Sequence, residues 1–309
     1  NLFHAAKVEG SLSNSWMSDI RDYGSLEKAF EEFRPDAVLH LAAQPLVWDG
    51  FRLPRETFET NVSGTANVID ASLNAGCKGI VAVTTDKVYE NKLEPSDLNE
   101  NDVMWGNDPY SASKVGSELV ASAYRSVSSL RSNDFRIVTV RGGNVIGGGD
   151  WSKNRIVPDA IRSWRANEDL LVRHPSYTRP WQHVIELADA YLLVLSKFFS
   201  GSSSMSPSYN VGPERTESIT VGQLSDLLCE RLGMSWKQED REHHIPEGAM
   251  LSLDSSKIRS ELNWKSVWDA KKSVFETSSW YQAFYSGVSA AELCISQIEL
   301  WNRNRSDAG

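Results

Sequence analysis

The sequence predicts an α/β fold, in which a doubly wound parallel sheet is combined with a smaller C-terminal α/β domain. Three apolar runs have the length of strands, at 36–44, 79–88 and 136–147. Two segments of helix length, 54–75 and 109–130, separate these runs. Strands that alternate with helices are typical of parallel sheets whose connecting helices cover the two faces. With 309 residues the chain can form one large domain or two modest ones.

The first run and the second helix have the clearest boundaries. The run DAVLHLAAQ follows a Pro35-Asp36 turn and is continuously apolar, which suits a parallel strand buried on both faces. The helix at 109–130 is expected to begin at Asp108-Pro109, because Asp can cap a helix and Pro is tolerated at its first position.

Later elements follow less regularly. An apolar helix is expected at 183–199 and a short strand in SYNVGP, with an exposed low-complexity loop at 201–208 before it. A further helix is expected between Thr220, a good N-cap, and Gly233, a good C-terminal stop. The rest of the C-terminal part reads as mostly helical.

The opening of the chain lacks the strand, glycine turn and helix with which dinucleotide-binding domains usually begin, and its first residue is Asn1. We therefore expect an N-terminally truncated version of such a domain.

Composition narrows the class of protein. A formal charge of −9 disfavours a broad nucleic-acid or anionic-membrane surface. No apolar run reaches the roughly 18 residues of a spanning helix, so a soluble protein is expected. Cys77, Cys229 and Cys294 are odd in number and widely separated, which favours reduced thiols and a cytoplasmic location.

Ligands of doubly wound sheets bind beyond the carboxyl ends of the strands. The three runs here lead into Ala42-Ala43-Gln44, Thr84-Thr85-Asp86-Lys87 and Gly143-Asn144. We expect these strand ends to converge on one cleft.

Tyr110 and Lys114 lie four residues apart on one face of the helix at 109–130. A free phenol titrates near pH ~10 and is a poor base at neutral pH, but an adjacent ammonium stabilises the phenolate. The pair can then take a proton from a sugar hydroxyl. The alternative, a surface Tyr and Lys at helical spacing, is common in proteins.

Thr85, Asp86 and Lys87 end a strand that is expected to be buried. Two opposite charges cannot enter a core without a large desolvation cost, so a pocket is the simplest location for them. A plain salt bridge at the strand end is the alternative.

The segment RGGNVIGGGDW is rich in glycine but lacks the GK[ST] of a phosphate-binding loop. Scattered arginines follow it, Arg155 and Arg173 among them, with the run TRPWQHV after them. These side chains could hold a diphosphate and a base, or could form the aromatic edge of a core. The six histidines show no metal-binding spacing, and no GxSxG motif supports hydrolase chemistry.

Together these segments resemble the extended short-chain dehydrogenase/reductase family and, within it, the CDP-glucose 4,6-dehydratases. The resemblance covers nearly all of the chain to about Trp301. Its motifs are HLAAQPLV, ETFETNVSGT, TTDKVYEN, DPYSASK, GNVIGGGDW, RPWQHV, YNVGP and SLDSSKIRSELNW. TDK is the discriminating one, since the dTDP-glucose and GDP-mannose dehydratases carry an acidic residue at the lysine and epimerases usually have a Ser-Ser-Ala type strand end.

The resemblance implies a Rossmann-like fold with bound NAD and a nucleotide-sugar substrate, CDP-glucose. It implies an NAD-binding domain at 1–150 and 181–212 and a nucleotide-sugar-binding domain at 151–180 and 213–309. The implied cofactor contacts are Asp19, Ile20, Leu41, Ala42, Ala43, Gln44, Asn61, Tyr110 and Lys114. The implied substrate contacts are Asn144, Arg155, Ile156, Val157, Arg173, Arg179 and His183.

The implied reaction begins when Tyr110, assisted by Thr85, removes the C4 hydroxyl proton while a hydride passes from C4 to NAD. Water then leaves across C5 and C6, with Asp86 as the acid and Lys87 as base or electrostatic stabiliser, and the hydride returns to C6. A homodimer formed through the helices at 54–75 and 109–130 is also implied, without nucleic acid, membrane or catalytic metal.

One segment departs from the family pattern. After HLAAQPLV the family usually continues with Arg and later Ser-Tyr, whereas this chain has Trp48, Gly50 and Phe51. Two alternatives to the dehydratase remain: an epimerase or reductase of the same fold, and a cofactor-free binding protein that kept the scaffold.

Overall fold

The computed structural model describes residues 1–90, 97–131, 134–200, 205–214, 218–239 and 252–307. Its centre is a four-stranded parallel sheet in the order β1-β2-β3-β8. The strands are β1 (Val38–His40), β2 (Gly79–Thr85), β3 (Arg136–Gly142) and β8 (Ser208–Val211). This is the doubly wound α/β arrangement that the sequence predicts.

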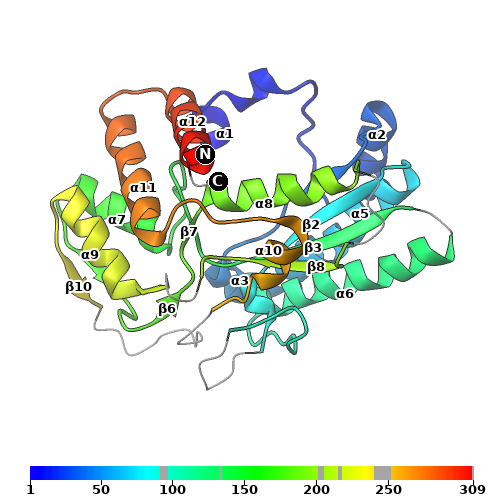
Figure 1. Ribbon diagram of the computed structural model, residues 1–309, viewed down its shortest axis with the longest axis horizontal. Helices are drawn as coiled ribbons and strands as arrows, with labels where there is room; N and C mark the ends of the chain where they lie inside the picture. The colour runs from blue at the N-terminus through cyan, green and yellow to red at the C-terminus, as the bar shows by residue number, and fades with distance from the viewer. Residues whose placement is uncertain (91–96, 132–133, 201–204, 215–217, 240–251, 308–309) are drawn as a thin grey trace.

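Helices cover the two faces of this sheet (Figure 1). On one face lie α5 (Gly64–Asn74) and α6 (Pro109–Leu130), with α2 (Tyr23–Phe33) packed on α5. On the other lies α8 (Val184–Lys197), whose apolar side packs with α10 (Ser256–Leu262) against Val81, Val138 and Val140. Asp108 caps α6 by accepting from the Ser111 N–H at 3.0 Å, as its sequence predicts.

Four of the predicted elements are divided or shortened. The run 36–44 forms a strand only at β1, and Leu41 beyond it is 57% exposed, because β1 pairs within the described sheet with β2 alone. The segment 54–75 forms α4 (Pro54–Phe58), a π-helical turn η2 (Glu59–Ser63) and α5. The run 136–147 divides into β3 and β4 (Val145–Ile146), and Asp86–Val88 after β2 form a short 3₁₀ turn, η3.

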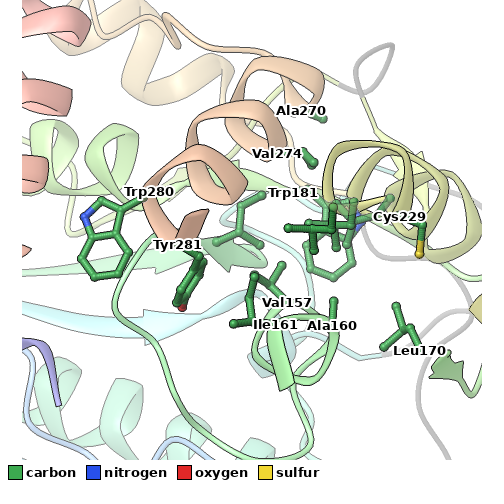
Figure 2. Packing of buried hydrophobic residues seen from close by; sticks show 14 of the residues in the cluster. Val157, Ala160, Ile161, Leu170, Trp181, Cys229, Ala270, Val274, Trp280 and Tyr281 are labelled. Carbon is green, nitrogen blue, oxygen red and sulfur yellow. The ribbon is translucent and has the colours of Figure 1, made fainter. Parts of the chain in front are cut away.

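A second hydrophobic core lies beside the sheet (Figure 2). Its helices are α7 (Ile156–Ala166), α9 (Val221–Leu232) and α11 (Ala270–Tyr285), and Trp181, Trp280 and Tyr281 are among its largest side chains. Thr220 and Gln223 form a capping box at the start of α9, and Gly233 ends it with a positive φ of 67°, as predicted. Short strand pairs border this core: β5 (Leu170–Val172) with β10 (Trp236–Gln238), β6 (Thr178–Arg179) with β9 (Ile219–Thr220), and β4 with β7 (Gln182–His183).

The remaining elements are α1 (Leu2–Ala5), η1 (Val8–Ser11), α3 (Val47–Arg52) and α12 (Ala290–Asp307). The two ends of the chain lie close together, where α1 contacts α12 (Figure 1). The expected loop at 201–208 lies partly outside the described residues. In the described part of the chain, no helix is both long and apolar enough to cross a membrane.

Candidate active site

A cavity of about 1150 Å³ lies between the carboxyl ends of the central strands and the second core. One wall is formed by α3, by Thr84–Lys87 after β2 and by Gly142–Asp150 after β3. The opposite wall comes from the start of α7 and from the segment between β5 and β6, including Tyr177. The ends of β2 and β3 therefore converge as predicted, whereas Ala42-Ala43-Gln44 after β1 do not line this cavity.

Most of the predicted catalytic and substrate residues line this cavity. They are Thr85, Asp86, Lys87, Tyr110, Asn144, Arg155, Ile156, Val157, Arg173 and Arg179. Lys114 lies one helical turn behind Tyr110 and is buried. His183 is buried outside the cavity lining, where its Nδ1 accepts from the Ile185 N–H at 3.3 Å and caps α8.

Three side chains of α6 bind three consecutive residues of β2. The side chains of Tyr110 and Thr85 are hydrogen bonded to each other. The Lys114 Nζ donates to the Val83 carbonyl at 3.0 Å, and the Glu118 Oε1 accepts from the Thr84 hydroxyl at 2.6 Å. Because residues four apart share a helix face, this row sets Tyr110 directly against the end of β2.

Glu118 at the end of this row was not anticipated from the sequence. It is 2% exposed and forms an ion pair with Arg141 of β3 at 2.8 Å, while Thr139 donates to its Oε2 at 2.8 Å. These bonds hold the pKa of its carboxyl below the usual value despite burial. The only sequence signal is its position eight residues after Tyr110, which places it on the same helix face.

The phenol of Tyr110 is buried at the cavity wall. Burial raises its pKa to about 12, although its hydrogen bond with Thr85 acts in the opposite direction. The sequence predicts that Lys114 lowers this value, but the Lys114 ammonium donates to Val83 instead. Burial also lowers the pKa of Lys114 to about 8, so this lysine remains a cation at neutral pH.

Asp86 is buried at the cavity wall and keeps one oxygen for a ligand. Its Oδ1 accepts from the Thr85 hydroxyl at 3.0 Å, whereas its Oδ2 has no hydrogen-bond partner among the described residues. Burial raises the pKa of this carboxyl, and the charge of Lys87 beside it acts in the opposite direction. A raised pKa favours the protonated form, which is the form that a general acid needs.

The residues expected near the cofactor lie around the end of β1. Asn61, on η2, is buried, and its carboxamide joins Gln44 to α6: Oδ1 accepts from the Gln44 N–H at 2.8 Å and Nδ2 donates to Ser113 Oγ at 2.8 Å. Leu41 and Ala42 are exposed, and Ala43 is partly exposed. Asn61 thus supports the strand end rather than forming part of an open surface.

Asp19 and Ile20 lie at the start of α5. Asn67 of α5 donates to the Ile20 carbonyl at 3.0 Å, and the Ile20 side chain occupies the space beside Gly64 that a Cβ would fill. Asp19 is exposed and pairs with Arg21 at 2.6 Å.

On the substrate side the arginines are already oriented by protein groups. Arg155 pairs with Asp150 at 3.1 Å, and Arg179, almost fully buried, lies 5.3 Å from the centre of the Tyr177 ring. The Tyr177 ring stacks on His174 with centroids 4.4 Å apart. Tyr177 and Trp48 line the cavity but were not anticipated as contacts, since aromatic side chains in such segments read equally well as the edge of a core.

The fold and this site belong to the nucleotide-sugar-modifying, NAD-dependent enzymes. The chain belongs to the NAD dependent epimerase/dehydratase family, which matches residues 4–212. It is 36% identical over 294 residues to the CDP-glucose 4,6-dehydratase of Salmonella typhimurium, covering 93% of this chain and 81% of that protein.

More distant relatives agree with this placement. The chain is 27% identical to a dTDP-glucose 4,6-dehydratase of Xanthomonas campestris, covering 93% of this chain and 85% of that one. The solved dTDP-glucose 4,6-dehydratase of Streptomyces venezuelae with NAD bound superposes with a TM-score of 0.74 at 27% identity, over 86% of this chain and 78% of that one. The UDP-glucose 4-epimerase of Thermotoga maritima shares the fold, with a TM-score of 0.75 at 21% identity, over 87% and 84%.

The residues present fit NAD, the cofactor of this family. An ammonium has three N–H donors, and Lys114 uses one of them on Val83, so it can also donate to a ribose hydroxyl. Leu41 and Ala42 leave exposed apolar surface at the end of β1, beside the row formed by α6 and β2.

Proposed function

We propose that the protein is an NAD-dependent lyase that converts CDP-glucose to CDP-4-keto-6-deoxyglucose. The observation that carries this proposal is the meeting of Tyr110 with Thr85, Asp86 and Lys87 at one cavity wall. A base for oxidation at C4 and an acid for elimination at C6 are then available in one site. The similarity to a CDP-glucose 4,6-dehydratase over 93% of the chain supports the choice of reaction and of nucleotide.

Oxidation at C4 is assigned to Tyr110 and Lys114. When bound, NAD would provide hydride transfer, first from C4 and later in the same turnover to C6. Tyr110 takes the C4 hydroxyl proton, and its phenol is hydrogen bonded to Thr85. Because the pKa of Tyr110 is raised by burial, phenolate formation depends on nearby positive charge, and Lys114 is the buried cation on the same helix face.

Elimination is assigned to Asp86 and Lys87. The 4-keto group acidifies the hydrogen at C5, and Lys87 takes this proton or stabilises the resulting charge. Asp86, whose pKa is raised, gives its proton to the C6 hydroxyl, which leaves as water. The partnerless Oδ2 of Asp86 is the atom suited to that transfer.

Diphosphate binding is assigned to the arginines opposite this wall. Arg155, Arg173 and Arg179 line the cavity, and planar guanidinium groups match phosphate oxygens in geometry and charge. Asn144, Ile156 and Val157 line the same cavity and complete the proposed substrate contacts. His183 would act on this site through the start of α8, which it caps.

Three broader features accompany this function. We propose residues 1–150 and 181–212 as the NAD-binding domain and 151–180 and 213–309 as the nucleotide-sugar domain. Two hydrophobic cores, one on the sheet and one around α7, α9 and α11 (Figure 2), support two domains, and α10 crosses the proposed boundary to pack on the sheet core. Exposed Phe58 on α4 and Leu119 on α6 support a homodimer through these adjoining helices. Free Cys77, Cys229 and Cys294 support a reducing, cytoplasmic location.

The test is to incubate the purified protein with NAD and CDP-glucose and to follow the mass of the nucleotide sugar. We expect loss of one water per molecule. Tyr110→Phe should abolish all conversion, and Asp86→Asn should abolish the loss of water. An isomer of unchanged mass would instead indicate an epimerase, and dehydration of dTDP-glucose or GDP-mannose but not CDP-glucose would contradict the nucleotide assignment.

A further inference from the structure

Trp48 and Arg173 meet across the cavity from opposite walls. Trp48 belongs to α3, which follows β1, whereas Arg173 follows β5 beside the second core. The Arg173 guanidinium carbon lies 5.6 Å from the centre of the Trp48 ring, and both residues line the cavity. A guanidinium over the face of an indole at this distance is attracted by the ring electrons. The contact therefore links the two walls.

This contact leaves Arg173 able to bind an anion. The cation–π contact requires no N–H···acceptor bond, and the guanidinium has five N–H groups in its plane. One of them, on Nη2, donates to the Asn154 carbonyl at 3.1 Å and fixes the orientation of the group. The contacts with Trp48 and with the Asn154 carbonyl together fix the orientation of the Arg173 guanidinium, so that its remaining N–H groups have a defined direction.

The residues that follow Trp48 fit α3 closely against the start of α6. A Cβ at Gly50 would lie 3.3 Å from the Tyr110 backbone nitrogen, so a larger residue there would press on Tyr110. Asp49 pairs with Arg52 at 3.1 Å within the same turn. Trp48 is 38% exposed in this arrangement, and Arg173 covers part of its ring.

We propose that Trp48 is a positioning residue that, through its cation–π contact with Arg173, orients this arginine toward the diphosphate of a nucleoside diphosphate ligand in this cavity. The proposal rests on the proposed function for the location of the diphosphate. An indole carries no charge, so at this position affinity for the diphosphate comes from the orientation of Arg173 rather than from a second cation. Loss of the ring frees the guanidinium and weakens binding of the anion.

The experiment is a calorimetric titration of CDP, which lacks the sugar and so measures binding without turnover. Trp48→Ala should weaken CDP binding about fivefold, the size of one partly exposed cation–π contact. Trp48→Phe keeps an aromatic face and should stay within about twofold of the parent. The matched control is Trp16→Ala, since Trp16 is 40% exposed and does not line the cavity.

A double-mutant cycle separates this role from a general loss of packing. Once Arg173→Met has removed the guanidinium, adding Trp48→Ala should cause no further loss of CDP affinity. Additive losses, or a Trp48→Ala protein that binds CDP like the parent, would overturn the proposal, and so would a parent protein that binds none of CDP, UDP and dTDP. Failure of the dehydration assay alone, with these binding results intact, would overturn only the proposed reaction.

Discussion

Lys114 is buried, and burial disfavours the charged form of its ammonium group. Its pKa is lowered from 10.5 to about 8 by burial, which the carboxylate of Glu118 partly offsets. The unfolded chain binds this proton more tightly than the folded protein, so the charged lysine lowers stability below pH 8. A shift of about 2.5 units corresponds to roughly 3 kcal/mol.

Lys114→Met should therefore abolish turnover and yet raise the free energy of unfolding at pH 7. We expect a gain of about 1–2 kcal/mol, because the Val83 carbonyl loses its hydrogen bond. The gain should shrink as the pH rises from 8 to 10.5, where the parent lysine becomes neutral. Urea unfolding at several pH values measures it, and a lower stability than the parent at pH 7 would contradict this account.

At this scale the sequence predicts which residues lie together in the site better than it predicts their hydrogen bonds. The four-residue spacing and the strand-end position of TTDK point to Tyr110, Lys114 and Asp86, which lie together as expected at the end of β2. Spacing cannot show that the Lys114 ammonium binds a strand carbonyl, because that depends on how deeply α6 sits on the sheet. Nor can it separate buried Glu118 from the solvated glutamates common on helices.

Helix α6 is fixed to the sheet by the buried pair of Glu118 and Arg141. Arg141 also donates to the Tyr89 hydroxyl at 2.8 Å, and that hydroxyl donates to Asn210 of β8 at 2.6 Å. The connected side chains join α6 to β3, to the segment after β2 and to β8. A buried pair whose bonds are all made is strongly destabilised when one partner loses its charge.

Glu118→Gln should lower the free energy of unfolding by about 3 kcal/mol, because Arg141 is left buried without a counter-charge. The matched control is Arg55→Ala, which breaks the exposed Arg55–Glu59 pair on α4 and should change stability by less than about 1 kcal/mol. Chemical denaturation compares the two variants. Equal effects would mean that the buried pair does not fix α6.

The sequence predicts the exact ends of helices that begin at a capping residue. It does not predict the ends of elements that depend on contacts with residues distant in the sequence. Helices α6 and α9 begin at the caps Asp108 and Thr220 and extend as expected. The interruption of 54–75 by η2 depends on the approach of Asn61 to Gln44, seventeen residues away. A sequence window of one helix contains no sign of such a contact.

At the scale of the whole molecule, two of the histidines that the structure describes, His40 and His183, are buried in their neutral form. Burial lowers the pKa of His40 from 6.5 to about 4 and that of His183 to about 3. Below pH 6.5 the unfolded chain takes up protons that the folded protein does not, so stability falls as the pH drops from 6.5 towards 4. Each histidine can account for roughly 3 kcal/mol of this loss.

His183→Asn should make the protein less sensitive to acid. Asparagine keeps the N-cap of α8 but does not titrate, so the melting temperature should fall less between pH 6.5 and 4.5 than in the parent. His4→Asn, at an exposed position near the N-terminus, is the matched control and should follow the parent curve. Parallel curves for His183→Asn and the parent would remove His183 from this explanation.

The π-helical turn η2 makes the register of one segment depend on a single extra residue. Its wider turn lies between α4 and α5, and it lets Thr57 and Asn61 both reach Gln44. If Glu59–Ser63 formed an ordinary helical turn with no residue removed, α4 would be turned by about 100° relative to α5. Thr57 would then face away from the end of β1. The wide turn therefore keeps Thr57 and Asn61 on the side of the helix that faces Gln44.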